Sequence, residues 1–488
     1  MTLRALLRPR VLLGVATLGL VVSTTSALLV ACASTSSVAT PDELATARRI
    51  TQEAQGQLSP AAPGTPATSR ATELAPLGYL EEELLLQGQA RTYDPVGTWG
   101  QDGQWTVRAR GELQPMATRV LVRRPQDPSR FNGVVLVEWL NTSLGLDLDG
   151  IWMVTRDELI REGYAWVGVS AEAVGISQLQ QALPGRYAQA RLPSGDLGFD
   201  VFTLTARLSR EAALGWGAPG RTPQQIKVIG SGYSKSASYL ISYVNAFQPL
   251  TGAFDGFYVR GATPAAIQVH DIGLNVVIPR WRMDMKVPVM QVQTEGEVKA
   301  SWTLSRTTDG PMNRYWEIAG AVHFDHGMQQ QALAVAQPWG LQPAACRHPT
   351  NALPAHLVDH AALDGLRRWV REGVPPAKVP HLRRNDSGWL VYGEPDGHVQ
   401  GGIQLPQLSL NLAHYDAGYT NWPTRWPDVW TGFTCLAGGA TLPAPQPGAA
   451  SATAVREAAQ ALVQQGVLKT ADVEGLVAQA VGTQAASR

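Results

Sequence analysis

The segment from residue 225 to residue 247 constrains the fold more than any other part of the chain. It reads QIKVIG, then SGYSKSAS, then YLISYVNAF, which is a short apolar strand, a glycine-rich turn and a run with apolar residues at helical spacing. A strand that turns directly into a helix holds the residue between them in a strained, exposed position, as a nucleophile elbow does. The sequence therefore predicts Ser234 as a nucleophile.

The neighbours of Ser234 fit this interpretation with one change. The usual pattern is G-x-S-x-G, and here Gly232 stands two residues before the serine while Ser236 stands two after it. Small residues are needed at both places because the strand and the helix nearly touch. The amide of Lys235, at the start of the helix, is the expected first donor to an oxyanion. A serine that only caps the helix is the alternative for so short a motif.

Strands and helices alternate along the chain on both sides of this segment. Apolar runs predict strands at 133–140, 164–170, 254–260, 287–294 and 314–320, and amphipathic runs predict helices at 152–162, 200–213 and 355–372. Continuous apolar strands separated by helices predict an α/β fold with a mostly parallel sheet covered on both faces. Residues 79–125 alternate in polarity and predict an N-terminal β extension.

An acid and a histidine follow two later strands. Glu295 and Glu297 come directly after the strand at 287–294, and His323 follows the strand at 314–320. Since parallel strands end at one edge of a sheet, these side chains should meet Ser234 there, in the chain order Ser, acid, His of α/β hydrolases. His323 would take the serine proton and a carboxylate would orient the ring. The turn at Gly296 favours Glu297 over Glu295, and both remain candidates.

The loop after the strand at 133–140, residues 139–142, is the expected source of a second oxyanion donor, with Leu140 and Asn141 as the leading candidates. Glu138 lies in that otherwise apolar strand. Burying its carboxylate unpaired would be costly, so we expect a structural partner such as Arg260 or Lys235.

Several longer strings carry a resemblance to a known family. They are VVLVEWLN (134–141), GYAWVGVSAEAVG (163–175), GYSKSA (232–237), VQTEGEV (292–298) and WEIAGAVH (316–323). Over residues 79–433 the chain resembles the bacterial α/β hydrolase domain-containing proteins, a largely uncharacterised group. The resemblance implies an α/β-hydrolase fold and a triad of Ser234, an acid and His323. Family members often have Asp where Glu297 stands and Gln where Lys235 stands.

The N-terminus has the pattern of an export signal. Three arginines precede an uncharged stretch at 11–31, which ends in Leu-Val-Ala before Cys32. This end resembles a bacterial lipobox, which implies a signal peptide at 1–31, a diacylated Cys32 and a lipid-anchored protein that faces the periplasm. Ala33, which is not Asp, favours the outer membrane. An uncleaved membrane anchor is the alternative.

The remaining composition shifts predict the domain organisation. Residues 32–76, rich in Ala, Ser, Thr and Pro, are expected to form a flexible tether with one short helix at 41–55, and residues 77–440 the hydrolase domain. Within that domain, 173–223 is the candidate lid and 385–435 an irregular extension. Residues 441–488 are expected to form a linker and two short C-terminal helices at 452–481, with Gly466 between them.

The cysteine count and the net charge bear on which bonds, partners and cofactors the sequence predicts. With Cys32 lipidated, Cys346 and Cys435 remain as one pair, which an oxidising compartment would join in a disulfide. The chain has 40 basic and 40 acidic residues and therefore no bias toward nucleic acid. No zinc-type spacing is present, and neither a metal nor an organic cofactor is implied.

We therefore expect hydrolysis of a small-molecule carboxylic ester through an acyl-enzyme with water as second substrate, esters being favoured by analogy with the fold. The alternatives are acyl transfer to an alcohol and a non-catalytic envelope protein that binds ligands or serves as a scaffold.

Overall fold

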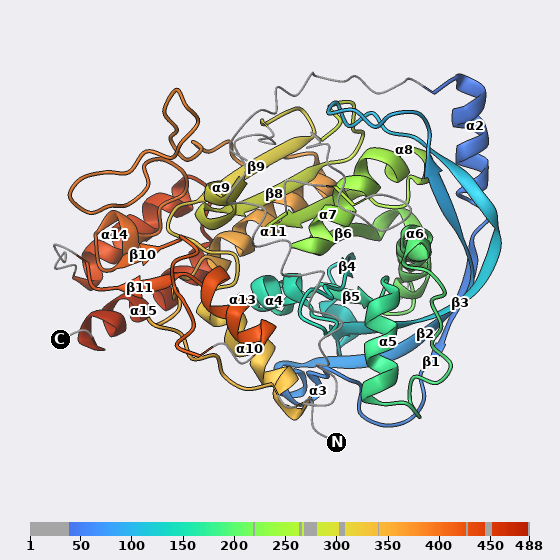
Figure 1. Cartoon of the computed structure of the whole chain (residues 1–488), viewed down its shortest axis with the longest axis horizontal. Helices are drawn as coiled ribbons and strands as arrows, with labels where there is room; N and C mark the ends of the chain where they lie inside the picture. The colour runs from blue at the N-terminus through green and yellow to red at the C-terminus, as the bar shows by residue number, and fades with distance from the viewer. Residues whose placement is uncertain are drawn as a thin grey trace.

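The computed structural model describes residues 39–217, 220–262, 266–267, 281–301, 308–339, 341–425, 428–444 and 451–486. Its centre is a nine-stranded sheet in the order β1-β2-β3-β5-β4-β6-β7-β8-β9 (Figure 1). The strands are β1 (Gln55–Pro60), β2 (Tyr79–Pro95), β3 (Val107–Pro125), β4 (Val134–Trp139), β5 (Ala165–Val169), β6 (Lys227–Tyr233), β7 (Gly256–Arg260), β8 (Val289–Thr294) and β9 (Asn313–Ile318).

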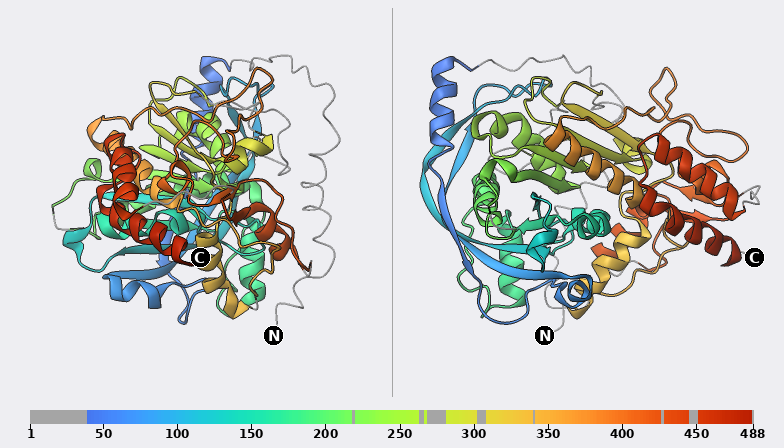
Figure 2. Two further views of the ribbon diagram at one scale, coloured as in Figure 1. Left: turned by 90° about the vertical axis from the view of Figure 1, so that its left-hand side faces the viewer. Right: turned by 180° about the vertical axis from the view of Figure 1, so that it is seen from behind.

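The sheet has an antiparallel part and a parallel part. Strands β1, β2 and β3 pair antiparallel, β3 pairs antiparallel with β5, and all pairs from β5 to β9 are parallel. Apart from Lys227 at the start of β6, the parallel strands are buried along their whole length, as their apolar runs predict. The long strands β2 and β3 curve around one side of the molecule (Figures 1 and 2).

Helices cover both faces of the parallel part, as two adjacent residues of β4 show. Glu138 accepts hydrogen bonds from the amides of Ile151 and Trp152, at the start of α4 (Gly150–Glu162). Trp139 points the other way and packs on Phe199 and Phe202 of α6 (Gly198–Ala213). Helix α11 (His356–Glu372) packs beside α4, and α7 (Lys235–Ser242) follows β6. The α/β class, the parallel sheet and the N-terminal β extension are confirmed.

The short helix predicted at 41–55 is present as α2 (Pro41–Ile50), whereas the flexible tether predicted for the rest of 32–76 is wrong for residues 51–76. Helix α2 has a capping box between Thr40 and Glu43, and β1 pairs with β2 over its full length. Arg70, just before α3 (Ala71–Leu74), is buried and donates two hydrogen bonds to Asp149. A β strand and a buried ion pair hold this segment, and neither requires the apolar periodicity by which helices and core strands are recognised.

The C-terminal region is more ordered than its sequence suggests. Its elements are α12 (Pro406–Ser409), β10 (His414–Asp416), α13 (Val429–Ala437), β11 (Ala440–Leu442), α14 (Ala452–Gln464) and α15 (Val473–Ala486). Strands β10 and β11 pair antiparallel. The prediction of an irregular stretch at 385–435 therefore fails for β10 and α13.

The two predicted C-terminal helices are present, on the side of the molecule opposite β1–β3 (Figure 1). Asp472, just before α15, accepts hydrogen bonds from Arg161 of α4 and His360 of α11, so this end is docked on the domain. Within the described ranges, no helix combines the length and the apolar character that crossing a bilayer requires.

Candidate active site

Ser234 stands on the sharp turn between β6 and α7. Its backbone has φ 60° and ψ −121°, a conformation that residues other than glycine rarely adopt and that functional sites often contain. The close approach of strand and helix explains Gly232, because a Cβ there would lie 2.9 Å from the backbone of Ser236. The turn predicted from the sequence is therefore the strained turn in the structure.

A continuous line of hydrogen bonds joins Ser234, His323 and Glu297. The Nε2 atom of His323 lies 2.9 Å from the Ser234 hydroxyl, and its Nδ1 atom lies 2.6 Å from Oε1 of Glu297. All three side chains are nearly enclosed, with exposed fractions of 9%, 8% and 5% for Ser234, His323 and Glu297. They follow the carboxyl ends of β6, β9 and β8, which is the edge that the strand order predicts.

The two neighbouring glutamates point to different partners. Both begin the short helix α9 (Glu295–Ser301). Oε2 of Glu297 accepts hydrogen bonds from the amide and hydroxyl of Thr294, which leaves Oε1 aimed at His323. Glu295 accepts from the amide of Gly320 at 2.8 Å and from the hydroxyl of Tyr392 at 3.1 Å. The structure thus brings Glu297 to the histidine and uses Glu295 to hold a loop.

The pKa directions of these two carboxyls agree with their contacts. Burial alone would raise the pKa of Glu297, but the hydrogen bond and charge of His323, the charge of Arg260 and the hydroxyl of Thr294 outweigh it, and the pKa is lowered. Burial raises the pKa of Glu295, against a weaker opposing effect of the Gly320 amide. Glu297 is therefore the carboxyl that stays ionised beside the histidine.

Tyr233 supports the histidine and was not singled out from the sequence. Its ring stacks on the His323 ring with centroids 5.1 Å apart, and its hydroxyl donates to the carbonyl of His323. Tyr233 occupies the variable position of the elbow motif, so the only sequence signal for its role is that it precedes Ser234 directly.

The predicted second oxyanion donors are wrong. The amide of Leu140 donates to the carbonyl of Val169, and the amide of Asn141 donates to the carbonyl of Leu148, so neither is available to a substrate. The loop folds back on itself between residues 141 and 148, a pairing that the sequence pattern does not contain. The Asn141 side chain instead donates to the carbonyl of Tyr233 and ties this loop to the end of β6.

Lys235 and Glu138 have other partners than expected. The Lys235 ammonium pairs with the buried carboxylate of Glu172 and donates to the hydroxyl of Thr142 at 3.0 Å. Glu138 contacts neither Lys235 nor Arg260. It caps the start of α4 and accepts from the indole of Trp166, and burial raises its pKa to about 8. Glu138 therefore has a structural role, as expected, but it fills that role by capping a helix: the carboxyl end of β4 lies next to the first residues of α4.

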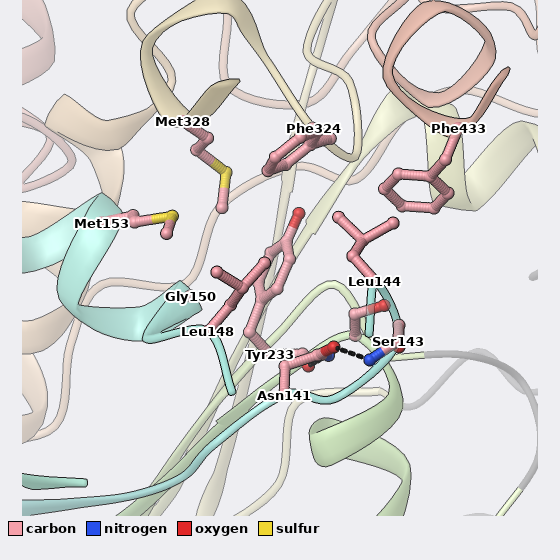
Figure 3. Close-up of a pocket in the computed structure, with 11 residues that line it drawn as sticks. Asn141, Ser143, Leu144, Leu148, Gly150, Met153, Tyr233, Phe324, Met328 and Phe433 are labelled. Atoms are coloured by element: carbon pink, nitrogen blue, oxygen red, sulfur yellow. Dashed lines mark hydrogen bonds between the residues drawn. The ribbon is translucent and has the colours of Figure 1, made fainter. Parts of the chain in front are cut away.

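An apolar cavity opens beside Ser234 (Figure 3). Its apolar lining consists of Leu144, Leu148, Met153, Phe324, Met328 and Phe433. These side chains come from the loop after β4, the start of α4, the segment before α10 (His326–Ala336), α10 itself and α13. None of the described residues of 173–223 lines it, so the predicted lid is not what walls this cavity. Most of 173–223 forms α5 (Ala173–Ala182) and α6 instead, and α6 covers the sheet.

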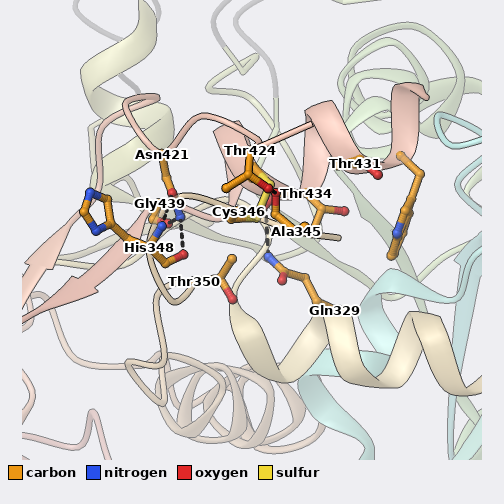
Figure 4. The surroundings of a disulfide bond; sticks show 12 residues. Gln329, Ala345, Cys346, His348, Thr350, Asn421, Thr424, Thr431, Thr434 and Gly439 are labelled. Atoms are coloured by element: carbon orange, nitrogen blue, oxygen red, sulfur yellow. Dashed lines mark hydrogen bonds between the residues drawn. A yellow bond between two sulfur atoms is a disulfide. The ribbon is translucent and has the colours of Figure 1, made fainter. Parts of the chain in front are cut away.

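The predicted disulfide is confirmed and stands behind one cavity wall. Cys346 and Cys435 are joined, with Cys435 buried in α13 two residues after Phe433 (Figure 4). The side chain of Gln329 donates to the carbonyls of Phe324 and Thr434, which links α10 to α13. The bridge therefore fixes the helix that places Phe433 6.0 Å, centroid to centroid, from the His323 ring.

A comparison of the sequence with models of protein families finds one family that matches most of the chain. A family model described as an alpha/beta hydrolase domain matches residues 46–478. No curated protein matches the sequence.

Solved structures match as well. The esterase Est22 is 11% identical, with a TM-score of 0.30 over 55% of this chain and 82% of that chain. XC6422 from Xanthomonas campestris, titled an a/b serine hydrolase without lid, is 11% identical, with a TM-score of 0.26 over 53% and 97%. An alpha-beta serine hydrolase homologue from Coxiella burnetii is 17% identical, with a TM-score of 0.27 over 46% and 92%.

Proposed function

The chain belongs to the alpha/beta hydrolase domain family, and from that premise we propose that it hydrolyses carboxylic esters through an acyl-enzyme on Ser234. The observation that carries the proposal is the unbroken hydrogen-bonded line from Glu297 through His323 to a serine held at positive φ. In this line His323 accepts the hydroxyl proton as the oxygen attacks, and Glu297 holds the ring and stabilises the imidazolium.

The steps after the attack use the same groups. The oxyanion that forms would accept from the amide of Lys235, the first residue of α7, and from the amide of Thr142, the next residue of the loop after Asn141. His323 then gives its proton to the leaving alcohol. In the second half, a water molecule loses a proton to His323, attacks the acyl carbon and releases the acid and Ser234.

The cavity supports an apolar acyl group on the substrate. Its wall contains six large apolar side chains and no charged one among the lining residues that the structure describes. The side chains of Met153 and Met328 extend into it (Figure 3), which favours a short chain. Esters of straight-chain acids from two to twelve carbons should show a maximum of kcat/KM at the short end. A maximum at ten or twelve carbons would contradict the size of the group proposed here.

Probe labelling tests the nucleophile without knowledge of the substrate. A fluorophosphonate reacts with an activated serine, and we expect it to label the wild-type protein and not Ser234→Ala. Ser231→Ala is the matched control, because Ser231 is buried in β6 and donates only to the carbonyl of Val137. An unlabelled wild type would favour a non-catalytic protein, and a labelled Ser234→Ala variant would place the chemistry on another serine.

We also propose that Cys32 carries lipid and anchors the protein in the bacterial envelope. Residues 1–38 lie outside the described residues, so the support is the basic and apolar leader before Leu29-Val30-Ala31-Cys32. Cys32→Ser should yield a soluble or unprocessed protein, because two or more acyl chains are needed for stable anchoring. Membrane-bound Cys32→Ser protein of normal mature mass would contradict lipidation.

A further inference from the structure

A buried arginine stands directly behind the acid of the candidate triad. Arg260, the last residue of β7, is fully buried. Its Nη1 atom lies 3.8 Å from Oε1 of Glu297, the same oxygen that faces His323. Its carbonyl accepts the amide hydrogen of Ser234 at 3.0 Å. One residue thus contacts both the acid and the turn that carries the nucleophile.

The guanidinium is balanced by charge more than by hydrogen bonds. Its Nε atom donates to Oδ1 of Asp359 at 2.9 Å, and the hydroxyl of Tyr258 donates to the same oxygen. Nη1 and Nη2 make no hydrogen bond within the described residues. Burial would lower the pKa of Arg260, but the carboxylates of Asp359 and Glu297 outweigh it and raise the pKa. Arg260 therefore stays a cation.

Other titratable groups face this cation from all the surrounding elements. Among the described residues they are Glu297, Asp325, Asp359, Tyr233 and Tyr258. His323 and His360 lie one contact further away, beside Glu297 and Asp359 respectively. Burial raises the pKa of Asp325 to about 6, so its carboxyl is partly protonated near that pH. Glu297 and Asp359 are the two carboxyl groups in contact with the guanidinium. Burial raises the pKa of Asp359, and the charge of Arg260 and the hydroxyl of Tyr258 oppose that rise.

We propose that Arg260 is a positioning residue that sets the proton affinity of the Glu297–His323 pair, with Asp359 as its counter-charge. The physical reason is Coulombic. A cation beside Glu297 favours its ionised form and disfavours an additional proton on the Glu297–His323 pair. The proton that leaves Ser234 must go to this pair, so the cation bears on the proposed reaction. Asp359 offsets part of that charge. The catalytic consequence rests on the function proposed above, whereas the electrostatic claim does not.

The proposal predicts opposite effects for opposite charges. Removal of the cation in Arg260→Gln should shift the titration midpoint of His323 to higher pH by about one pH unit. Asp359→Asn should shift it to lower pH, because a negative charge is lost. The double variant should return it toward the wild-type value, and Arg260→Lys, which keeps the charge, should leave it nearly in place. A residue that only supports the fold would give neither the opposite signs nor the recovery.

Two measurements keep this proposal separate from the proposed function. Nitrogen-15 NMR of labelled histidines, with His323→Ala as the assignment standard, follows the titration even if Ser234 is inert. The pH dependence of fluorophosphonate inactivation should move by the same amount when the serine is active, and a wild type that is not inactivated contradicts only the hydrolase function. Arg314→Gln is the matched control, since this buried arginine donates to backbone carbonyls near the start of β9 and should leave the midpoint unchanged.

Each result has a defined meaning. A midpoint unmoved in Arg260→Gln, or equal shifts of the same sign in Arg260→Gln and Asp359→Asn, would overturn the proposal. If Arg260→Gln does not fold, the downward shift in Asp359→Asn and its reversal in the charge-neutral double variant decide the matter alone. Opposite shifts with recovery in the double variant would establish Arg260 and Asp359 as an electrostatic pair acting through Glu297.

Discussion

The strand-end turns that hold Ser234, Glu297 and His323 differ from the C-terminal extension, residues 381–442, that helps to wall the same site. The turns follow buried parallel strands, so the position of each side chain is set within a few residues of the sheet. The extension reaches the site through scattered ties: the Cys346–Cys435 disulfide, the Tyr392–Glu295 hydrogen bond and the amide of Phe324 on the carbonyl of Ala437. Chemistry is therefore placed by local structure and the cavity wall by long-range ties.

This difference separates what each region can tolerate. A change in a strand-end turn alters the side chains proposed to react, and the effect should appear in the chemical step with little change in stability. A change in the extension loosens a tie and should appear first in the free energy of unfolding, with a smaller effect on catalysis. The predictions below test this separation, from the largest expected effect to the smallest.

The two glutamates of α9 give the sharpest test. Glu297→Gln removes the charge that would stabilise the imidazolium. It should lower kcat by about 10⁴-fold, the typical effect of neutralising the acid of such a triad. Glu295→Gln can still accept from the amide of Gly320 and should lower kcat by less than about tenfold. Steady-state hydrolysis of a short-chain aryl ester measures both. The reverse ranking would contradict the assignment of Glu297.

Loss of the disulfide should affect stability first. The bridge closes a sequence separation of 89 residues, and its removal in a Cys346→Ala and Cys435→Ala double variant should lower the free energy of unfolding by roughly 4–5 kcal/mol in the chain-entropy model. Urea unfolding of the variant and of reduced wild type should agree. Activity below the transition should fall only a few-fold, and a loss as large as that of Glu297→Gln would contradict the separation drawn here.

The N-terminal segment is also held by a long-range tie, and pH should reveal it. Burial would raise the pKa of Asp149, but Arg70 and Arg123 outweigh it and lower the pKa to about 2. Because the folded pKa lies below the ordinary 3.8, this stability is present above pH 4 and is lost as the pH falls through 2. The loss should be about 2 kcal/mol. Arg70→Met should reduce the loss in this window, and Arg48→Met at the exposed end of α2 should not.

The sequence predicts well that Ser234, Glu297 and His323 meet at one sheet edge, because the signals for their positions are local. Apolar runs mark the strands, parallel strands end at one edge, and Ser234, Glu297 and His323 each follow such an end. Contacts between distant segments leave no such signal. Arg70 reaches Asp149 from a segment that resembles a tether, and Phe433 reaches His323 from one that resembles a loop. The amides of Leu140 and Asn141 are lost to the oxyanion because their loop closes on itself.

Phe433 provides the smallest and most specific test of the comparison. It belongs to the extension, yet its ring packs edge-on against His323, lies tilted against Phe324 and lines the cavity. The side chain is only partly buried, so Phe433→Ala should lower the free energy of unfolding less than a core Phe→Ala change would. The loss of an apolar wall should reduce kcat/KM for a short-chain ester by about tenfold, mainly through KM, because the triad itself is held by the strand-end turns.

Trp389→Ala, which removes an exposed aromatic side chain elsewhere in the extension, is the matched control and should change neither the free energy of unfolding nor kcat/KM. A large fall in kcat for Phe433→Ala would show that the extension positions His323 as well as walling the cavity, and would erase the distinction between the two regions.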